Sequence, residues 1–290
     1  MGKKTFLLGL AVLLAGKLFA MDLTVIAGAG NFSFDTSSET SLNQNGEEFK
    51  GHFFPFGKLN IKDQLTDTFG YTATMERDPL LRNTLSCEMT IDAGFLKLSV
   101  GPLFGMFNSW DTLIRPGVST SLGLEFPGIF FLNLRGGATF GSEYSLETSC
   151  ISLGFWLPNL LSTINLSANK YNDGPLIQDE LLRVSYRADI HAKNIPYTVS
   201  IEMGYQALTR GYSSSGEDII RAVFLGFEAD VNIKPNFTLI LGSEIPVFIW
   251  GKDDLKKAKN HWFFQAFAGF KWSLEKRTDD FIPLENMGEE

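Results

Sequence analysis

Hydrophobic and polar residues alternate along most of this chain, and the alternation is clearest in the segment 261–275. Its even positions from Trp262 to Trp272 are all apolar, whereas its odd positions mix aromatic, polar and charged residues. Because successive side chains of a β-strand point to opposite sides, this pattern predicts a strand with one wholly apolar face. If the strand crosses a membrane at a tilt of about 40°, the two tryptophans on that face lie about 26 Å apart along the membrane normal. We therefore interpret Trp262 and Trp272 as an aromatic girdle at the two edges of a membrane-spanning strand.

Similar alternating runs continue through the whole chain after residue 22. We identify about fourteen of them, at 23–34, 52–62, 68–77, 84–92, 95–107, 117–126, 129–141, 146–157, 160–171, 180–192, 197–209, 219–233, 237–250 and 261–275. Most are ten residues or longer, which suits a tilted membrane-spanning strand better than the five or six residues of a typical soluble strand. The runs 23–34, 52–62 and 146–157 alternate poorly. Either they contain bulges or the true number of strands is twelve.

The two faces of these runs differ in charge. In the central parts of eleven runs one face carries no charged residue, whereas the other carries twelve: Glu88, Lys97, Glu125, Arg135, Arg183, Arg187, Asp189, Glu202, Glu228, Asp230, Glu244 and Lys271. A Lys or Arg near the middle of a lipid-facing surface costs about 2–4 kcal/mol, whereas an inward-facing position tolerates it. A soluble sheet would not need strands this long or so many apolar outward faces. We therefore predict an all-β fold, an antiparallel transmembrane β-barrel with these twelve residues lining its lumen.

The connections between the runs also alternate in length. Short turns rich in Gly, Pro and Asn, such as those at 93–94, 127–128 and 158–159, alternate with longer loops such as 35–51 and 251–260. In this pattern the whole chain after residue 20 resembles the porin-like outer-membrane β-barrels of diderm bacteria. No signature motif accompanies the resemblance, so it indicates a class and not a family. It implies a place in the bacterial outer membrane, contact with outer-membrane lipid, and folding by the barrel-assembly machinery.

Both ends of the chain have features of their own. Residues 1–20 read as a signal peptide, with Lys3 and Lys4 before an apolar run and a plausible cleavage site at Ala20. The barrel is then expected over 21–275, and 276–290 as an acidic periplasmic tail. The tail is a departure from the resemblance, because such barrels usually end at an aromatic residue of the last strand. No apolar stretch after residue 20 is long enough for a transmembrane helix.

Composition narrows the classes of partner and chemistry. After loss of the signal segment, 22 of the 25 Lys and Arg residues remain against 33 Asp and Glu, a net charge of −11, which argues against nucleic acid. The three histidines, His52, His191 and His261, accompany no nucleophile motif, so we expect no enzyme activity. The acidic residues of loop 35–51 lack calcium-loop spacing, and we expect neither a metal nor a cofactor. Cys87 and Cys150 fall on opposite faces of separate runs, so we expect free thiols.

The function that we expect is a monomeric, porin-like passive channel for small polar solutes. The lumen-facing charges have both signs, as in many permeable pores. The same residues could instead form an ion-pair network that plugs the barrel, in which case the protein would be a structural or surface-interaction, adhesin-like barrel.

One lumen contact follows from a turn. The segment 193–196 joins two runs whose flanking residues, Ala192 and Tyr197, both belong to the apolar face. If these two oppose each other, Arg187 lies opposite Glu202 on the inner face, within reach of an ion pair. We therefore predict a cross-strand pair of Arg187 with Glu202 in the periplasmic half of the lumen.

Overall fold

A closed barrel of antiparallel strands forms the described part of the chain. The computed structural model describes residues 21–31, 54–78, 83–107, 113–174, 177–191, 196–212, 216–251 and 264–274. Its strands are β1 (Asp22–Gly30), β2 (Phe54–Gln64), β3 (Phe69–Arg77), β4 (Asn83–Asp92), β5 (Leu96–Phe107), β6 (Leu113–Phe126), β7 (Phe130–Thr139), β8 (Tyr144–Leu157), β9 (Leu160–Asp173), β10 (Ile177–His191), β11 (Tyr197–Tyr212), β12 (Gly216–Lys234), β13 (Phe237–Gly251) and β14 (Gln265–Ser273).

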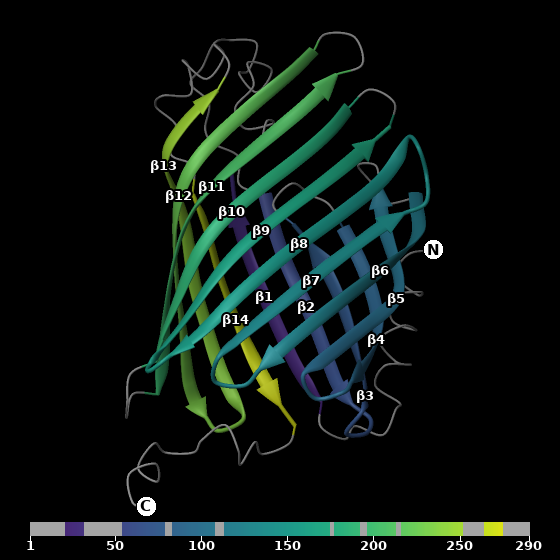
Figure 1. The fold of residues 1–290 in the computed structure, drawn as a ribbon. Coiled ribbons are helices and arrows are strands. Elements are labelled where there is room, and N and C mark those ends of the chain that lie inside the picture. Colours follow the sequence, from purple (N-terminus) through teal and green to yellow (C-terminus); the bar gives the residue numbers. More distant parts are fainter. Residues whose placement is uncertain are drawn as a thin grey trace, which may run out of the picture.

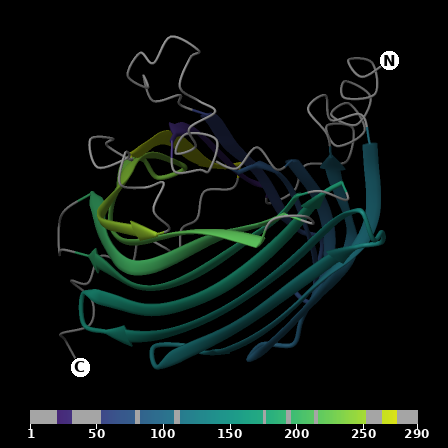
Figure 2. The same ribbon diagram turned by 90° about the horizontal axis from the view of Figure 1, so that it is seen from above.

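Each strand pairs with its neighbours in sequence, and β1 also pairs with β14, which closes the barrel (Figure 1). Figure 2 shows the same wall of strands from above. The structure therefore confirms the predicted all-β antiparallel barrel, with fourteen strands and not twelve. In the described ranges no helix has the length and hydropathy that a membrane span requires.

The predicted short turns have the backbone conformations that their residues favour. Gly94, Gly128 and Asn159 have φ angles of 80°, 74° and 63°, in the left-handed region that glycine and asparagine tolerate best. They connect β4 to β5, β6 to β7 and β8 to β9.

The three poorly alternating runs form regular strands. β1, β2 and β8 pair with their neighbours without any shift in register, so bulges do not explain their pattern. The reason is that apolar side chains occupy both faces of these strands. Ile26 of β1 and Phe56 of β2 line a cavity inside the barrel, and Leu146 of β8 is buried.

A bulge occurs instead in β13. Val223 of β12 pairs with Phe248, whereas the next residue, Phe224, pairs with Pro246, so Val247 is an additional residue in β13. Proline has no N–H to donate and is tolerated at such irregular positions. The extra residue reverses the alternation above it.

The two surfaces of the barrel differ as expected for a membrane protein. Large apolar side chains such as Met89, Val100 and Met203 are exposed on the outer face, and Trp272 lies there with 40 % of its surface exposed. Cys87 is exposed on the same face as Met89, whereas Cys150 is partly buried and opposes Arg135. Both thiols are free, as predicted.

Several expectations fall on residues outside the described ranges. These are the signal segment 1–20, the loop 35–51, the tail 276–290, and the side chains of His52, His261 and Trp262.

Candidate functional site

Ion pairs connect all twelve charged residues that the face pattern singles out. The pairs are Lys97 with Glu125 (2.8 Å) and Asp92 (3.7 Å), Arg135 with Glu88 (2.8 Å), Arg183 with Glu202 (2.9 Å) and Glu244 (2.7 Å), Arg187 with Asp189 and Glu228 (both 2.7 Å), and Lys271 with Asp230 (2.6 Å).

Several of these pairs join strands that are not neighbours. Arg135 of β7 reaches Glu88 of β4, and Arg183 of β10 reaches Glu244 of β13. On the concave inner side of a curved sheet, side chains from distant strands converge, whereas on the convex outer side they diverge. The structure therefore places these charged groups on the inner face of the barrel.

The register of β10 and β11 is as predicted, but the partner of Arg187 is not. Arg187 lies directly opposite Glu202. Its guanidinium instead donates to Asp189, Ser200 and Glu228, at 2.7, 2.8 and 2.7 Å. Glu202 accepts a bond from Arg183. The predicted ion pair is wrong because each long arginine side chain leans along the strand direction, toward the end of β10 at His191, and binds carboxylates one or two rows beyond its own.

An aromatic ring supports the second arginine. The Arg183 guanidinium carbon lies 3.9 Å from the centre of the Phe224 ring, a cation–π contact, on the way to its two carboxylates. Phe224 is fully buried. Gly204 makes room for the ring, because a Cβ at Gly204 would lie 2.7 Å from Phe224 Cζ.

The cluster on β10 to β13 has an excess of acid. Two arginines, Arg183 and Arg187, face four carboxylates, which are Asp189, Glu202, Glu228 and Glu244. The cluster therefore carries a net charge of −2, so its field favours cations near this part of the wall.

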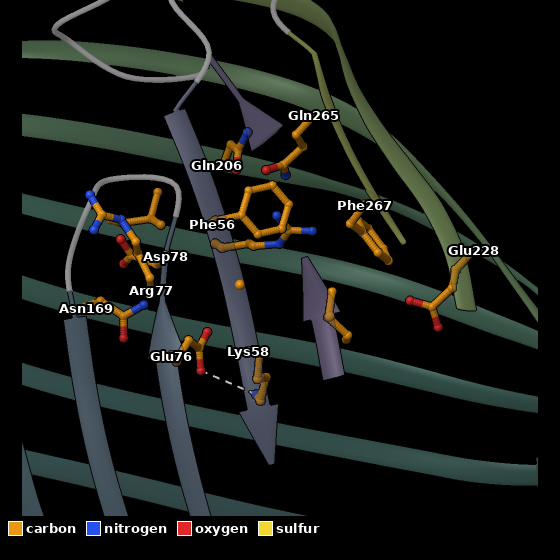
Figure 3. A pocket seen from close by; sticks show the side chains of 14 residues that line it. Phe56, Lys58, Glu76, Arg77, Asp78, Asn169, Gln206, Glu228, Gln265 and Phe267 are labelled. Carbon is orange, nitrogen blue, oxygen red and sulfur yellow. Dashed lines mark ion pairs between the residues drawn. The ribbon is translucent and has the colours of Figure 1, made fainter. Parts of the chain in front are cut away.

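A cavity of about 370 Å³ lies between this cluster and the opposite wall (Figure 3). One side is formed by β1 to β3 and β14, and the other by β9 to β12. Its lining combines apolar groups, amides and charges: Ile26, Phe56, Gly57, Lys58, Glu76, Arg77, Asp78, Asn169, Leu181, Arg183, Gln206, Glu228, Gln265 and Phe267. Lys58 and Glu76 form an ion pair of 3.4 Å within it.

Sequence reasoning missed most of this lining. Of the twelve predicted residues, only Arg183 and Glu228 contact the cavity. The aromatic residues on both faces of 52–62 were the available signal for Phe56. Phe267 lies on the mixed face of the last strand, where aromatic, polar and charged residues all occur, so the sequence pattern does not distinguish it as a site residue. His191 lies away from the cavity at the end of β10, with Nδ1 3.1 Å from Thr198 Oγ1.

Comparisons with known proteins show similarity in fold. An outer membrane channel from Pseudomonas putida F1 is similar with a TM-score of 0.52 and 9 % identity over 89 % of this chain and 97 % of that chain. The NanC porin has a TM-score of 0.46 and 9 % identity, over 86 % of this chain and 98 % of that chain. A bacterial polysaccharide outer membrane secretin has a TM-score of 0.44 and 11 % identity, over 88 % of this chain and 98 % of that chain. No protein family and no curated protein sequence matches this chain. The chain thus has the fold of the porin-like outer-membrane β-barrels, with no specific family assigned.

Proposed function

We propose that the protein is a channel of the bacterial outer membrane through which small polar solutes diffuse passively. The observation that carries the proposal is the cavity inside the barrel, which residues of opposite walls line with amides and paired charges. Interiors of this kind, polar and of both charge signs, are typical of barrels that conduct solutes. The exposed apolar outer face suits contact with lipid, and the barrel-assembly machinery would insert such a chain.

Single-channel recording in planar lipid bilayers tests this proposal. The purified full chain should give stable, discrete openings in KCl. A barrel that inserts and gives no openings would overturn the proposal and favour the adhesin-like alternative. Insertion is checked independently by the difference in gel migration between boiled and unboiled samples.

A pair of variants connects the current to the cavity. Gln265→Trp places a large ring in the cavity lining and should lower the single-channel conductance. Met203→Trp adds the same ring on the outer face, where Met203 is 51 % exposed, and should leave the conductance unchanged. Equal conductance in both variants would mean that ions do not pass through this cavity.

A further inference from the structure

We propose that the cavity binds organic cations with an aromatic or apolar body, and so selects them among the solutes that enter the barrel. This inference deepens the proposed function and rests on it for the passage of the solute. Binding itself requires only the cavity.

The first argument is a row of residues across the inner face. Going around the barrel, Phe56, Gly28, Phe267, Gly242 and Glu228 occupy successive paired positions on β2, β1, β14, β13 and β12. Figure 3 shows Phe56, Phe267 and Glu228 in that order across the cavity. Two aromatic rings and a carboxylate therefore form one row that runs from one side of the cavity to the other.

The glycines in this row determine how the rings lie. A Cβ at Gly28 would lie 2.5 Å from Phe56 Cζ, and one at Gly242 would lie 2.2 Å from Phe267 Cζ. Each ring therefore lies over the backbone of a glycine in a neighbouring strand. The two rings are 6.4 Å apart and meet edge to face. Both rings line the cavity.

The second argument concerns charge. Two of the three cations of the lining are already paired, Lys58 with Glu76 and Arg183 with two carboxylates and the Phe224 ring. An anionic solute would have to displace these carboxylates. The third cation, Arg77, has an Nε without a hydrogen-bond partner among the described residues, and it is next to Asp78, so the two residues add one charge of each sign to the lining.

A cationic solute meets more favourable groups. Among the described residues Glu228 pairs with one arginine, Arg187, at 2.7 Å, and it belongs to the cluster of net charge −2. The negative faces of aromatic rings attract cations, and the contact strengthens where water is excluded. An ammonium group beside Glu228, with its apolar body on Phe267 and Phe56, satisfies both features.

Three probes of similar charge magnitude test the proposal. Benzyltrimethylammonium carries a ring and a cation, tetramethylammonium carries the cation alone, and benzenesulfonate carries a ring and an anion. Binding is measured by titration calorimetry on the detergent-solubilised full chain, and block of the single-channel current is measured in bilayers. Benzyltrimethylammonium should bind and block at the lowest concentration of the three.

Two variants and two matched controls place the effect in the row. Phe267→Leu keeps an apolar side chain and should weaken benzyltrimethylammonium binding by about 2- to 30-fold, the range of one cation–π contact. Glu228→Gln should weaken both ammonium probes. Phe131→Leu and Glu125→Gln change the same residue types elsewhere in the barrel, outside the cavity lining. These two control variants should leave the binding of both ammonium probes unchanged.

The outcomes separate the two proposals. Binding of the aromatic cation without any current would overturn the channel and leave the site standing. Current with equal block by all three probes, or with equal effects of Phe267→Leu and Phe131→Leu, would overturn the site and leave the channel standing.

Discussion

Glycine residues decide how closely the strands and the inward side chains of this barrel can approach one another. The clearest case is Gly101 of β5, where a Cβ would lie 1.9 Å from the carbonyl oxygen of Cys87 and 2.7 Å from the Cα of Glu88. Both atoms belong to the backbone of β4, so a side-chain rotation cannot relieve the clash. At Gly136 of β7, by contrast, the nearest atom to an added Cβ is 3.7 Å away.

These distances make a prediction for a matched pair of variants. Gly101→Ala should force β4 and β5 apart and lower the free energy of unfolding by about 1–3 kcal/mol, the usual cost of overpacking. Gly136→Ala should change it little. The measurement is the urea concentration at which the boiled and unboiled gel bands become identical. Equal midpoints for the two variants would contradict the close approach at Gly101.

At the scale of single strands, the bulge in β13 shows where alternation stops predicting which face a residue occupies. Below the bulge the even positions Ile240 and Gly242 point inward, and a continued alternation would direct Phe248 inward as well. Phe248 is instead 69 % exposed, whereas Ile249 packs against Leu208 and Ile220, which are both almost fully buried. Pro246 was the available local signal, because a proline within a strand pattern favours an edge or a bulge, but alternation alone does not identify Val247 as the additional residue.

The prediction for this strand reverses what alternation alone implies. Ile249→Ala should remove contacts with the buried pair and lower the free energy of unfolding by about 2 kcal/mol. Phe248→Ala removes a larger side chain from an outward position and should cost less. The same gel-shift titration in urea measures both. A larger loss for Phe248→Ala would place the bulge elsewhere.

The paired strands β10 and β11 show what a sequence can and cannot predict. Their register was predictable because a slip of one residue would move the charges of a whole strand into lipid. The partner of Arg187 was not, because a long side chain can choose among several carboxylates along the neighbouring strands. The Phe56–Phe267 contact could not be predicted for a different reason. β1 lies between β2 and β14, so the two rings come together only when the barrel closes.

At the scale of the whole molecule, charges are distributed unevenly between the two faces. The chain has a formal net charge of −8, and four carboxylates against two arginines gather on the inner wall of β10 to β13. The outer face has ion pairs of its own, such as Lys170 with Glu180 at 3.7 Å. An inner charge acts on a permeating ion at short range, whereas an outer charge lies beyond the wall.

Removing Arg187 should therefore make the proposed channel more selective for cations. Arg187→Ala takes the inner cluster from a net charge of −2 to −3 and leaves Asp189 and Glu228 without their cation. One unit charge at about 7 Å in water is worth about 0.6 kcal/mol, favourable for a cation and equally unfavourable for an anion, so the cation-to-anion permeability ratio should rise about sevenfold. The ratio is obtained from the reversal potential in a KCl gradient. Low salt is required, because the screening length falls from about 10 Å at 0.1 M to about 3 Å at 1 M.

Two further variants make this result decisive. Lys170→Ala removes the same unit of charge from the outer face and should leave the reversal potential unchanged. Glu228→Gln removes a negative charge from the inner cluster and should shift selectivity toward anions, which gives a second test if Arg187→Ala folds poorly. An equal shift in Arg187→Ala and Lys170→Ala would mean that the net charge of the protein sets selectivity. A change in reversal potential that occurs in Arg187→Ala but not in Lys170→Ala, and that disappears at high salt, would show that the responsible charges lie inside the barrel. Asp189 and Glu228 are the charges that Arg187→Ala leaves without their cation there.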